Sequence, residues 1–139
     1  MPYESTYFDN DSGLLRIGKG VVTLDELLAA AKEHQSDPER AKKITHVLID
    51  FTEVTELRMN AEEAKRLAEA SKITARLAPG GAAAIVAPRD HVFGIARMWE
   101  SLVDEEASWS TRVFRDRAEA EAWLRAQLAA AGRASAREG

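Results

Sequence analysis

This 139-residue chain contains no cysteine and no long apolar segment. The absence of cysteine excludes disulfide bonds and thiolate metal sites. No apolar run approaches the roughly 18 residues that suggest a membrane-spanning helix, so we expect no membrane span. The N-terminal residues contain neither the basic segment nor the apolar segment of a signal peptide, and we therefore expect a cytoplasmic protein.

The chain also lacks an excess of positive charge. With 19 Lys and Arg against 23 Asp and Glu, its formal net charge is −4 at pH 7. Nucleic-acid binding depends largely on cationic contacts with phosphates, so we expect no nucleic-acid partner. The length suits one domain with one core. We expect this domain over residues 1–131, followed by a small, polar and flexible C-terminal tail over residues 132–139.

Sequence signatures of catalysis and cofactor binding are missing as well. His34, His46 and His91 have no metal-ligand spacing, whereas a zinc site needs three or four clustered ligands. The chain has no G-x-S-x-G nucleophile motif. The glycine pairs at 18–20 and 80–81 lack the spacing of a phosphate-binding loop. We therefore predict a protein that is not an enzyme, with no catalytic residue, no metal and no cofactor.

Two hydrophobic runs are the strongest structural signal in the chain. Residues 44–51 and 82–87 are largely apolar, which is typical of strands buried on both faces. Strands are also predicted over 3–9 and 14–22, because turn-forming residues separate them as in an antiparallel hairpin. A further short strand is expected over 111–114.

Helices are predicted between these strands from capping residues and from apolar spacings of three and four residues. They begin after Thr23, extend over 60–77 and 90–103, and begin again after Asp116. Strands joined by helices pair in parallel. The predicted fold is a single layered α/β domain, whose mixed sheet of about five strands combines an N-terminal antiparallel hairpin with three parallel strands, and which has four helices. Trp123 falls on the apolar face of the last helix and is predicted to lie in the core.

The polar segments that follow the two buried runs predict a candidate site. Ligands of open α/β sheets bind beyond the carboxyl ends of the parallel strands. We interpret 52–60 and 88–94 as the loops at these ends, and an arginine beside a helix N-terminus favours an anion. The same residues would also serve an exposed helix cap. The hypothetical ligand-binding residues are Asp50, Thr52, Met59, Asn60, Arg89, His91 and Phe93.

Three stretches, Val47–Thr52, Phe93–Met98 and Val113–Leu124, carry a resemblance to a known family. Over residues 5–128 the chain resembles the STAS superfamily, named for sulfate transporters and anti-sigma factor antagonists. The closer likeness is to its SpoIIAA-like branch, which is related to CRAL-TRIO lipid-transfer domains. The resemblance implies a SpoIIAA-like fold, and many members of this branch have no assigned function.

Two alternative functions follow from the resemblance. The first is a non-enzymatic domain that binds a small lipid-like, apolar or anionic ligand at the strand ends. The second is a protein-interaction module of the antagonist type, which binds a partner protein or forms a homodimer. Phosphoregulated relatives carry Ser or Thr at the start of the helix after the strand, whereas this chain has Met59 and Asn60 there. We therefore predict that no phosphorylation switch operates at this helix start.

Overall fold

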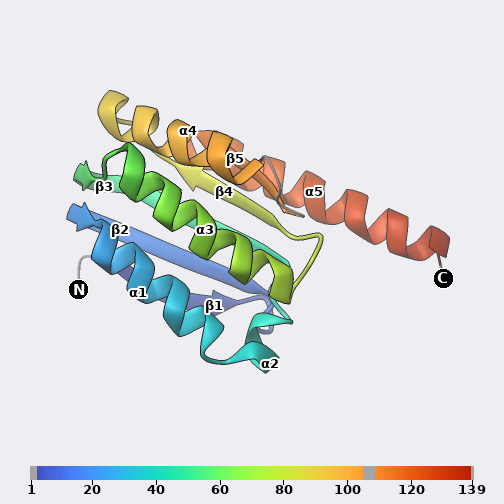
Figure 1. Ribbon diagram of the computed structural model, residues 1–139. Coiled ribbons are helices and arrows are strands. Elements are labelled where there is room, and N and C mark those ends of the chain that lie inside the picture. Colours follow the sequence, from blue (N-terminus) through green and yellow to red (C-terminus); the bar gives the residue numbers. More distant parts are fainter. Residues whose placement is uncertain (1–2, 105–108, 139) are drawn as a thin grey trace.

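The computed structural model describes residues 3–104 and 109–138, which form an α/β arrangement of five strands and five helices (Figure 1). In chain order the elements are β1 (Tyr3–Phe8), β2 (Gly13–Thr23), α1 (Leu24–Gln35), α2 (Pro38–Ala41), β3 (His46–Arg58), α3 (Ala61–Leu77), β4 (Ala82–Val86), α4 (Asp90–Asp104), β5 (Ser110–Phe114) and α5 (Arg117–Glu138).

The strands form one mixed sheet in the order β1-β2-β3-β4-β5. β1 and β2 pair in antiparallel fashion, and every other neighbouring pair is parallel. The predicted sheet, with its N-terminal hairpin, is confirmed. The predicted number of helices is one too low, because the four-residue helix α2 begins at Pro38. Proline breaks helix interiors but is favoured in a first turn, where its missing N–H costs no hydrogen bond.

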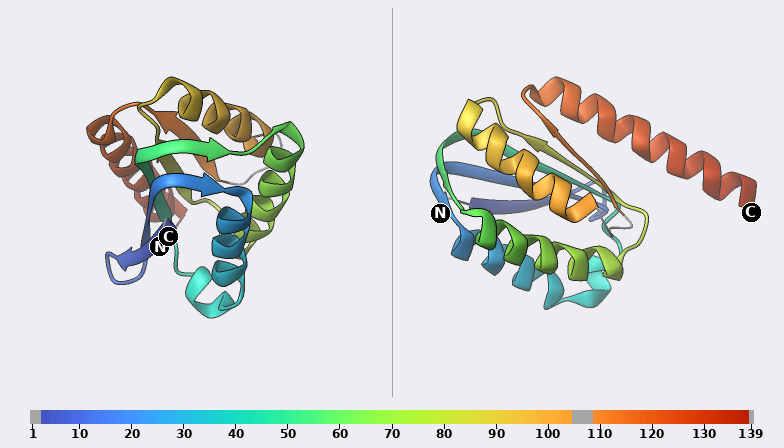
Figure 2. Two further views of the ribbon diagram at one scale, coloured as in Figure 1. Left: turned by 90° about the vertical axis from the view of Figure 1, so that its left-hand side faces the viewer. Right: turned by 45° about the horizontal axis from the view of Figure 1, so that its top comes forward.

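Helices cover the two faces of the sheet unequally. Figure 2 shows α1, α3 and α4 on one face and α5 on the other. The larger core cluster, which includes Val54, Ile85 and Val92, lies under the three helices. A smaller cluster, which includes Leu48 and Leu124, lies between the sheet and α5. The sheet therefore has two distinct apolar interfaces.

Strand β3 is longer than the sequence indicates. It continues to Arg58, so the prediction of a loop over 52–60 is wrong. β2 pairs with β3 along almost its whole length, whereas β4 pairs only with His46–Asp50. Beyond Asp50 the strand buries Val54 and Leu57, whereas Thr52, Glu53 and Thr55 are exposed. This change from two buried faces to one replaces the apolar run with a polar pattern that resembles a loop.

The capping boxes at Thr23 and Asn60 are both present, which confirms two predicted helix starts. α5 continues to Glu138 and so includes residues 132–138, which the sequence assigns to a tail; the flexibility of that segment stays a prediction. Trp123 is half-buried against Phe114, with ring centroids 5.7 Å apart, rather than enclosed in the core. Within the described residues, no helix has the length and apolar character needed to cross a membrane.

Candidate functional site

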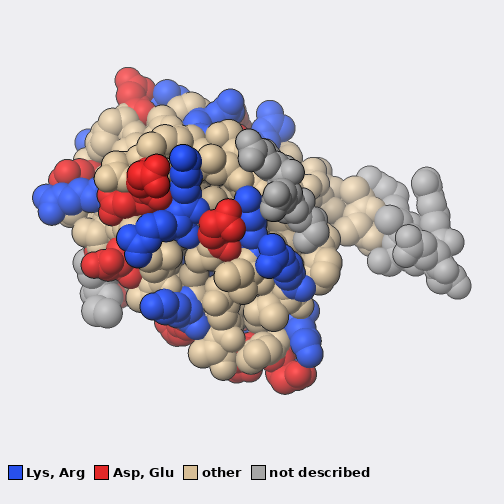
Figure 3. Space-filling view, viewed as in Figure 1, with Lys and Arg blue, Asp and Glu red and all other residues tan. Residues whose placement is uncertain are grey.

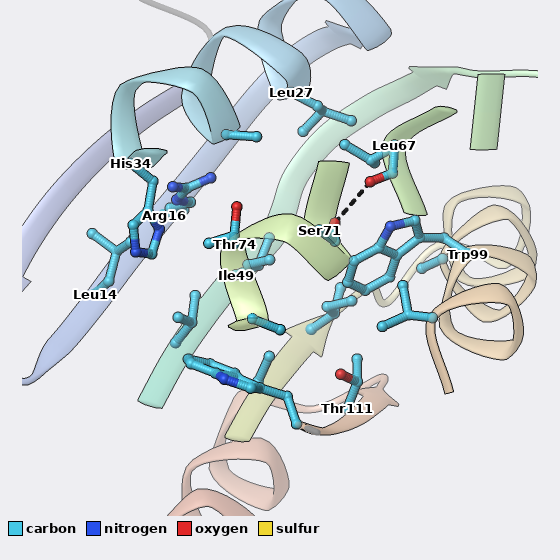
Figure 4. A pocket seen from close by; sticks show the side chains of 18 of the residues that line it. Leu14, Arg16, Leu27, His34, Ile49, Leu67, Ser71, Thr74, Trp99 and Thr111 are labelled. Carbon is cyan, nitrogen blue, oxygen red and sulfur yellow. Dashed lines mark hydrogen bonds between the residues drawn. The ribbon is translucent and has the colours of Figure 1, made fainter. Parts of the chain in front are cut away.

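An apolar cavity of about 130 Å³ lies between the sheet and helices α1, α3 and α4 (Figure 4). Its lining follows β3 from Val47 to Leu57, and α3 contributes Ser71 and Ala75. Successive strand residues point to opposite faces. Ile49 therefore faces the cavity, whereas Leu48 packs toward α5. The helices contribute small residues, such as Ala31 and Ala96, beside larger ones such as Trp99.

Two buried donors at this cavity have no hydrogen-bond partner within the described residues: Nε of Arg16 and Nε1 of Trp99. Arg16 lies on β2 and is half-buried. Its Nη2 donates to the carbonyl oxygen of Ala30 at 3.3 Å. Its Cζ atom lies 6.0 Å from the centroid of the Tyr3 ring. The cavity therefore combines an apolar wall with unsatisfied polar groups.

The groups around Arg16 are neutral. Burial lowers the pKa of His34 to about 4, and the nearby charge of Arg16 acts in the same direction. Burial also raises the pKa of Tyr3, although Arg16 opposes this shift. At neutral pH the imidazole is therefore uncharged and the phenol protonated. Among the described residues, no carboxylate forms an ion pair or hydrogen bond with Arg16, so its charge lacks a counter-ion from the chain.

Asp50 and Thr52, the first two predicted site residues, belong to a hydrogen-bond cluster on the face of the sheet that α5 covers. Asp50 is only 7% exposed. Its Oδ1 accepts hydrogen bonds from the backbone N–H of Thr52, at 2.8 Å, and from the Thr52 hydroxyl. Its Oδ2 accepts from Nη1 of Arg117 at 2.9 Å, and Nε of Arg117 donates to Glu121. These contacts attach the start of α5 to the sheet.

Met59 and Asn60, the next two predicted residues, have different roles in the structure. Met59 is buried and lines the cavity from the end of β3. Asn60 is exposed, and its Oδ1 caps α3 by accepting from the backbone N–H of Glu63 at 2.8 Å. Of the seven predicted residues, Met59 alone lines the cavity.

The remaining predicted residues lie around the start of α4. Arg89 and His91 are exposed, and Phe93 is half-buried. The guanidinium Cζ of Arg115 stands 4.1 Å from the centroid of the Phe93 ring, and its Nη1 donates to Asp90 at 2.7 Å. Within the described residues, no hydrogen bond or ion pair links this group to the Asp50 cluster. The predicted site is therefore not one pocket, and ligand binding by these residues stays a prediction.

Comparisons with known proteins bear on the fold. No family model and no curated protein matches the chain. Among matching solved structures, the unphosphorylated anti-sigma factor antagonist SpoIIAA gives a TM-score of 0.58 at 9% identity, over 90% of this chain and 97% of that one. The fold is SpoIIAA-like. An uncharacterised DUF3478 protein from Shewanella loihica PV-4, itself with a SpoIIAA-like fold, gives a TM-score of 0.54 at 18% identity, over 88% of this chain and 91% of that one.

These structural matches establish the SpoIIAA-like fold and confirm the fold that the sequence resemblance implies. The sequence analysis did not predict Arg16, His34 or Trp99, which line the cavity, as site residues. In the sequence Arg16 lies between the apolar residues Leu15 and Ile17 of the predicted second strand, and nothing there marks it as a site residue. In the SpoIIAA-like fold both faces of β2 are partly covered, and Arg16 faces the helices. The adjacent apolar residues Leu14 and Leu15, like Val21 and Val22, are the sequence signal that both faces of β2 are apolar.

Proposed function

We propose that this chain is a non-enzymatic binding domain that takes up a small, mainly apolar molecule in the cavity beneath α1, α3 and α4. The observation that carries the proposal is an apolar cavity with two buried donors, on Arg16 and Trp99, that have no partner in the described part of the chain. Buried polar groups are nearly always hydrogen-bonded, so each orphan donor needs an explanation. A bound molecule with acceptor atoms would supply one.

The size of the cavity limits the ligand. An apolar cavity of roughly 150 Å³ stays dry and binds benzene. The cavity described above, at about 130 Å³, suits a molecule of similar size. The ligand class is the one that the sequence analysis predicts, but the proposed location moves from the strand ends to the space under the helices.

Uptake of hexan-1-ol, followed by heteronuclear NMR, tests the proposal. The parent protein should show saturable shifts at cavity residues. Ala75→Leu places a larger side chain in the cavity and should abolish these shifts, because Ala75 is buried and lines it. Ala122→Leu, on the exposed side of α5, is the matched control and should bind as the parent does. Equal binding by Ala75→Leu, or no binding by the parent, would contradict the proposal.

A protein-interaction module is the second candidate, and one observation favours it. α5 packs on β3, β4 and β5, which leaves the β1–β2 part of that sheet face less covered. Leu15 and Ile17 are half-buried there, and Phe8 is 37% exposed. A partner protein or a second copy of the chain would cover these side chains. The other face offers little charge steering, because basic and acidic side chains intermingle over its described residues (Figure 3).

Native mass spectrometry separates the two candidates. The cavity proposal predicts a monomer that carries a small adduct, and the adduct should be lost on Ala75→Leu. The interaction module predicts a protein-only complex that Ile17→Glu disrupts while Ala75→Leu does not.

A further inference from the structure

We infer that the molecule in the cavity is a small monocarboxylate, whose carboxylate pairs with Arg16 and whose apolar body lies beneath α3. This inference rests on the proposed function and names its ligand class. It depends on the charge of Arg16 and on the groups that surround it.

No carboxylate among the described residues neutralises the charge of Arg16. A guanidinium stays protonated at all physiological pH values. Its Nη2 donates to the carbonyl oxygen of Ala30 at 3.3 Å, and the guanidinium also has a side-chain hydrogen bond with Tyr3, but its buried Nε has no partner within the described residues. The guanidinium as a whole is half-buried, but its Nε is shielded from solvent, and buried polar atoms are nearly always hydrogen-bonded. The missing partner is therefore an acceptor with negative charge.

At neutral pH, His34 and Tyr3 beside Arg16 carry no negative charge that would compete with a bound anion. Figure 4 shows the imidazole of His34 beside Arg16, on the β2 and α1 side of the cavity. Because His34 is neutral at pH 7, it adds no second charge. The protonated hydroxyl of Tyr3, which also lines the cavity, is a further donor for a carboxylate oxygen. One guanidinium with neutral donors matches an anion of a single charge.

The shape of the site orients the ligand. Arg16 is half-buried, so a carboxylate beside it keeps contact with solvent. The planar guanidinium presents parallel N–H groups that suit the two oxygens of a carboxylate. Beyond it the lining is apolar and includes Ile49, Leu67 and Ile85. An aliphatic or aromatic body would therefore point from Arg16 toward these side chains.

The test compares hexanoate with hexan-1-ol, which differ in the head group. The parent should bind hexanoate about tenfold or more tightly, because an ionic hydrogen bond is stronger than a neutral one. Arg16→Met keeps an apolar stem and removes the charge, so it should lose this preference and still bind hexan-1-ol. Lys19→Met is the matched control on the same strand. Lys19 is exposed, and its Nζ lies 3.8 Å from Oε2 of Glu53. It should bind both probes as the parent does.

The outcomes distinguish a failure of the carboxylate assignment from a failure of the proposed function. If Arg16→Met binds hexanoate as tightly as the parent, the carboxylate assignment is overturned, while binding of hexan-1-ol still supports the cavity. If the parent binds neither probe, the proposed function itself fails. If Arg16→Met does not fold, intermolecular NOEs in the parent decide. Contacts of the hexanoate C2 protons with Arg16 support the inference, and contacts of the terminal methyl with Arg16 overturn it.

Discussion

The two faces of the sheet hold their buried charges in opposite ways. On the α5 face, both oxygens of Asp50 have partners, in Thr52 and Arg117. On the face of α1, α3 and α4, the buried Nε of Arg16 has none within the described residues. A charge whose partners come from the chain stabilises the fold, whereas a charge with an open donor is available to a ligand. The comparison thus separates a structural site from a candidate binding site.

The two faces of the sheet also differ in packing, and the face that carries the open donor is the less closely packed one. Between the sheet and α5, Ala84 and Ala120 have no exposed surface, and Leu124 packs against them. On the other face, the cavity of about 130 Å³ interrupts the contacts between sheet and helices. One interface is closed, and the other keeps space for a guest molecule.

The largest expected effect comes from truncation on the closed face. Leu124→Ala should lower the free energy of unfolding by about 2–5 kcal/mol, because it removes buried contacts and leaves a cavity. Leu67→Ala, beside the existing cavity, is the matched comparison and should cost less, since Leu67 is half-buried and already borders empty space. Chemical denaturation measures both. An equal or larger loss for Leu67→Ala would mean that the two faces are packed alike.

The next effect is a pH dependence due to His34. Burial lowers its pKa from 6.5 to about 4 in the folded protein. Between these values the unfolded chain binds a proton that the folded chain does not, so stability falls as the pH falls from 6.5 to 4. A shift of this size corresponds to a loss of about 3 kcal/mol. Denaturation curves at several pH values, compared with those of His34→Gln, isolate the contribution. An unchanged pH dependence in the variant would contradict the assignment.

A smaller effect on stability distinguishes the role of Arg117 from that of Arg16. Arg117→Met removes one partner of the buried Asp50 and should cost about 1–2 kcal/mol, since Arg117 itself is half-exposed. Arg16→Met should cost less than Arg117→Met, because it removes neutral hydrogen bonds but breaks no ion pair within the described residues. Chemical denaturation of the two variants side by side is the measurement. A larger loss for Arg16→Met would show that Arg16 has a structural role.

No effect at all is expected from a kinase at the start of α3. Asn60 caps that helix and cannot accept phosphate, and the nearest hydroxyl before it, on Thr55, lies within β3. Phosphopeptide mapping after expression in the natural host should therefore find no stoichiometric modification there. Full phosphorylation of Thr55 would show that the switch has moved along the chain rather than been lost.

The sequence predicts the strands and helices far better than the contacts that distinguish the two faces of the sheet. The strands and helices follow from local patterns: apolar runs mark β3 and β4, and capping boxes mark α1 and α3. The end of β3 was missed because a strand with one buried face has the polar pattern of a loop. The contact of Asp50 with Arg117 joins residues far apart in the chain, and no local pattern indicates it.

The cavity is still less accessible to prediction from sequence. Its volume depends on small side chains contributed by separate elements, such as Ala31 on α1 and Ala75 on α3. Each alanine alone is an ordinary helix residue. Arg16 could not be recognised as cavity-facing without knowing that helices cover that side of β2. The residues that form a space are therefore harder to identify than those that fill one.

A crystal structure of the protein under xenon pressure tests the central claim most directly. Dry apolar cavities bind xenon, whereas closed interiors do not. The account predicts xenon density between the sheet and α3, in contact with Ile49, Leu67 and Trp99. Xenon absent from this space, with the side chains of α1 and α3 packed directly on the sheet, would contradict it.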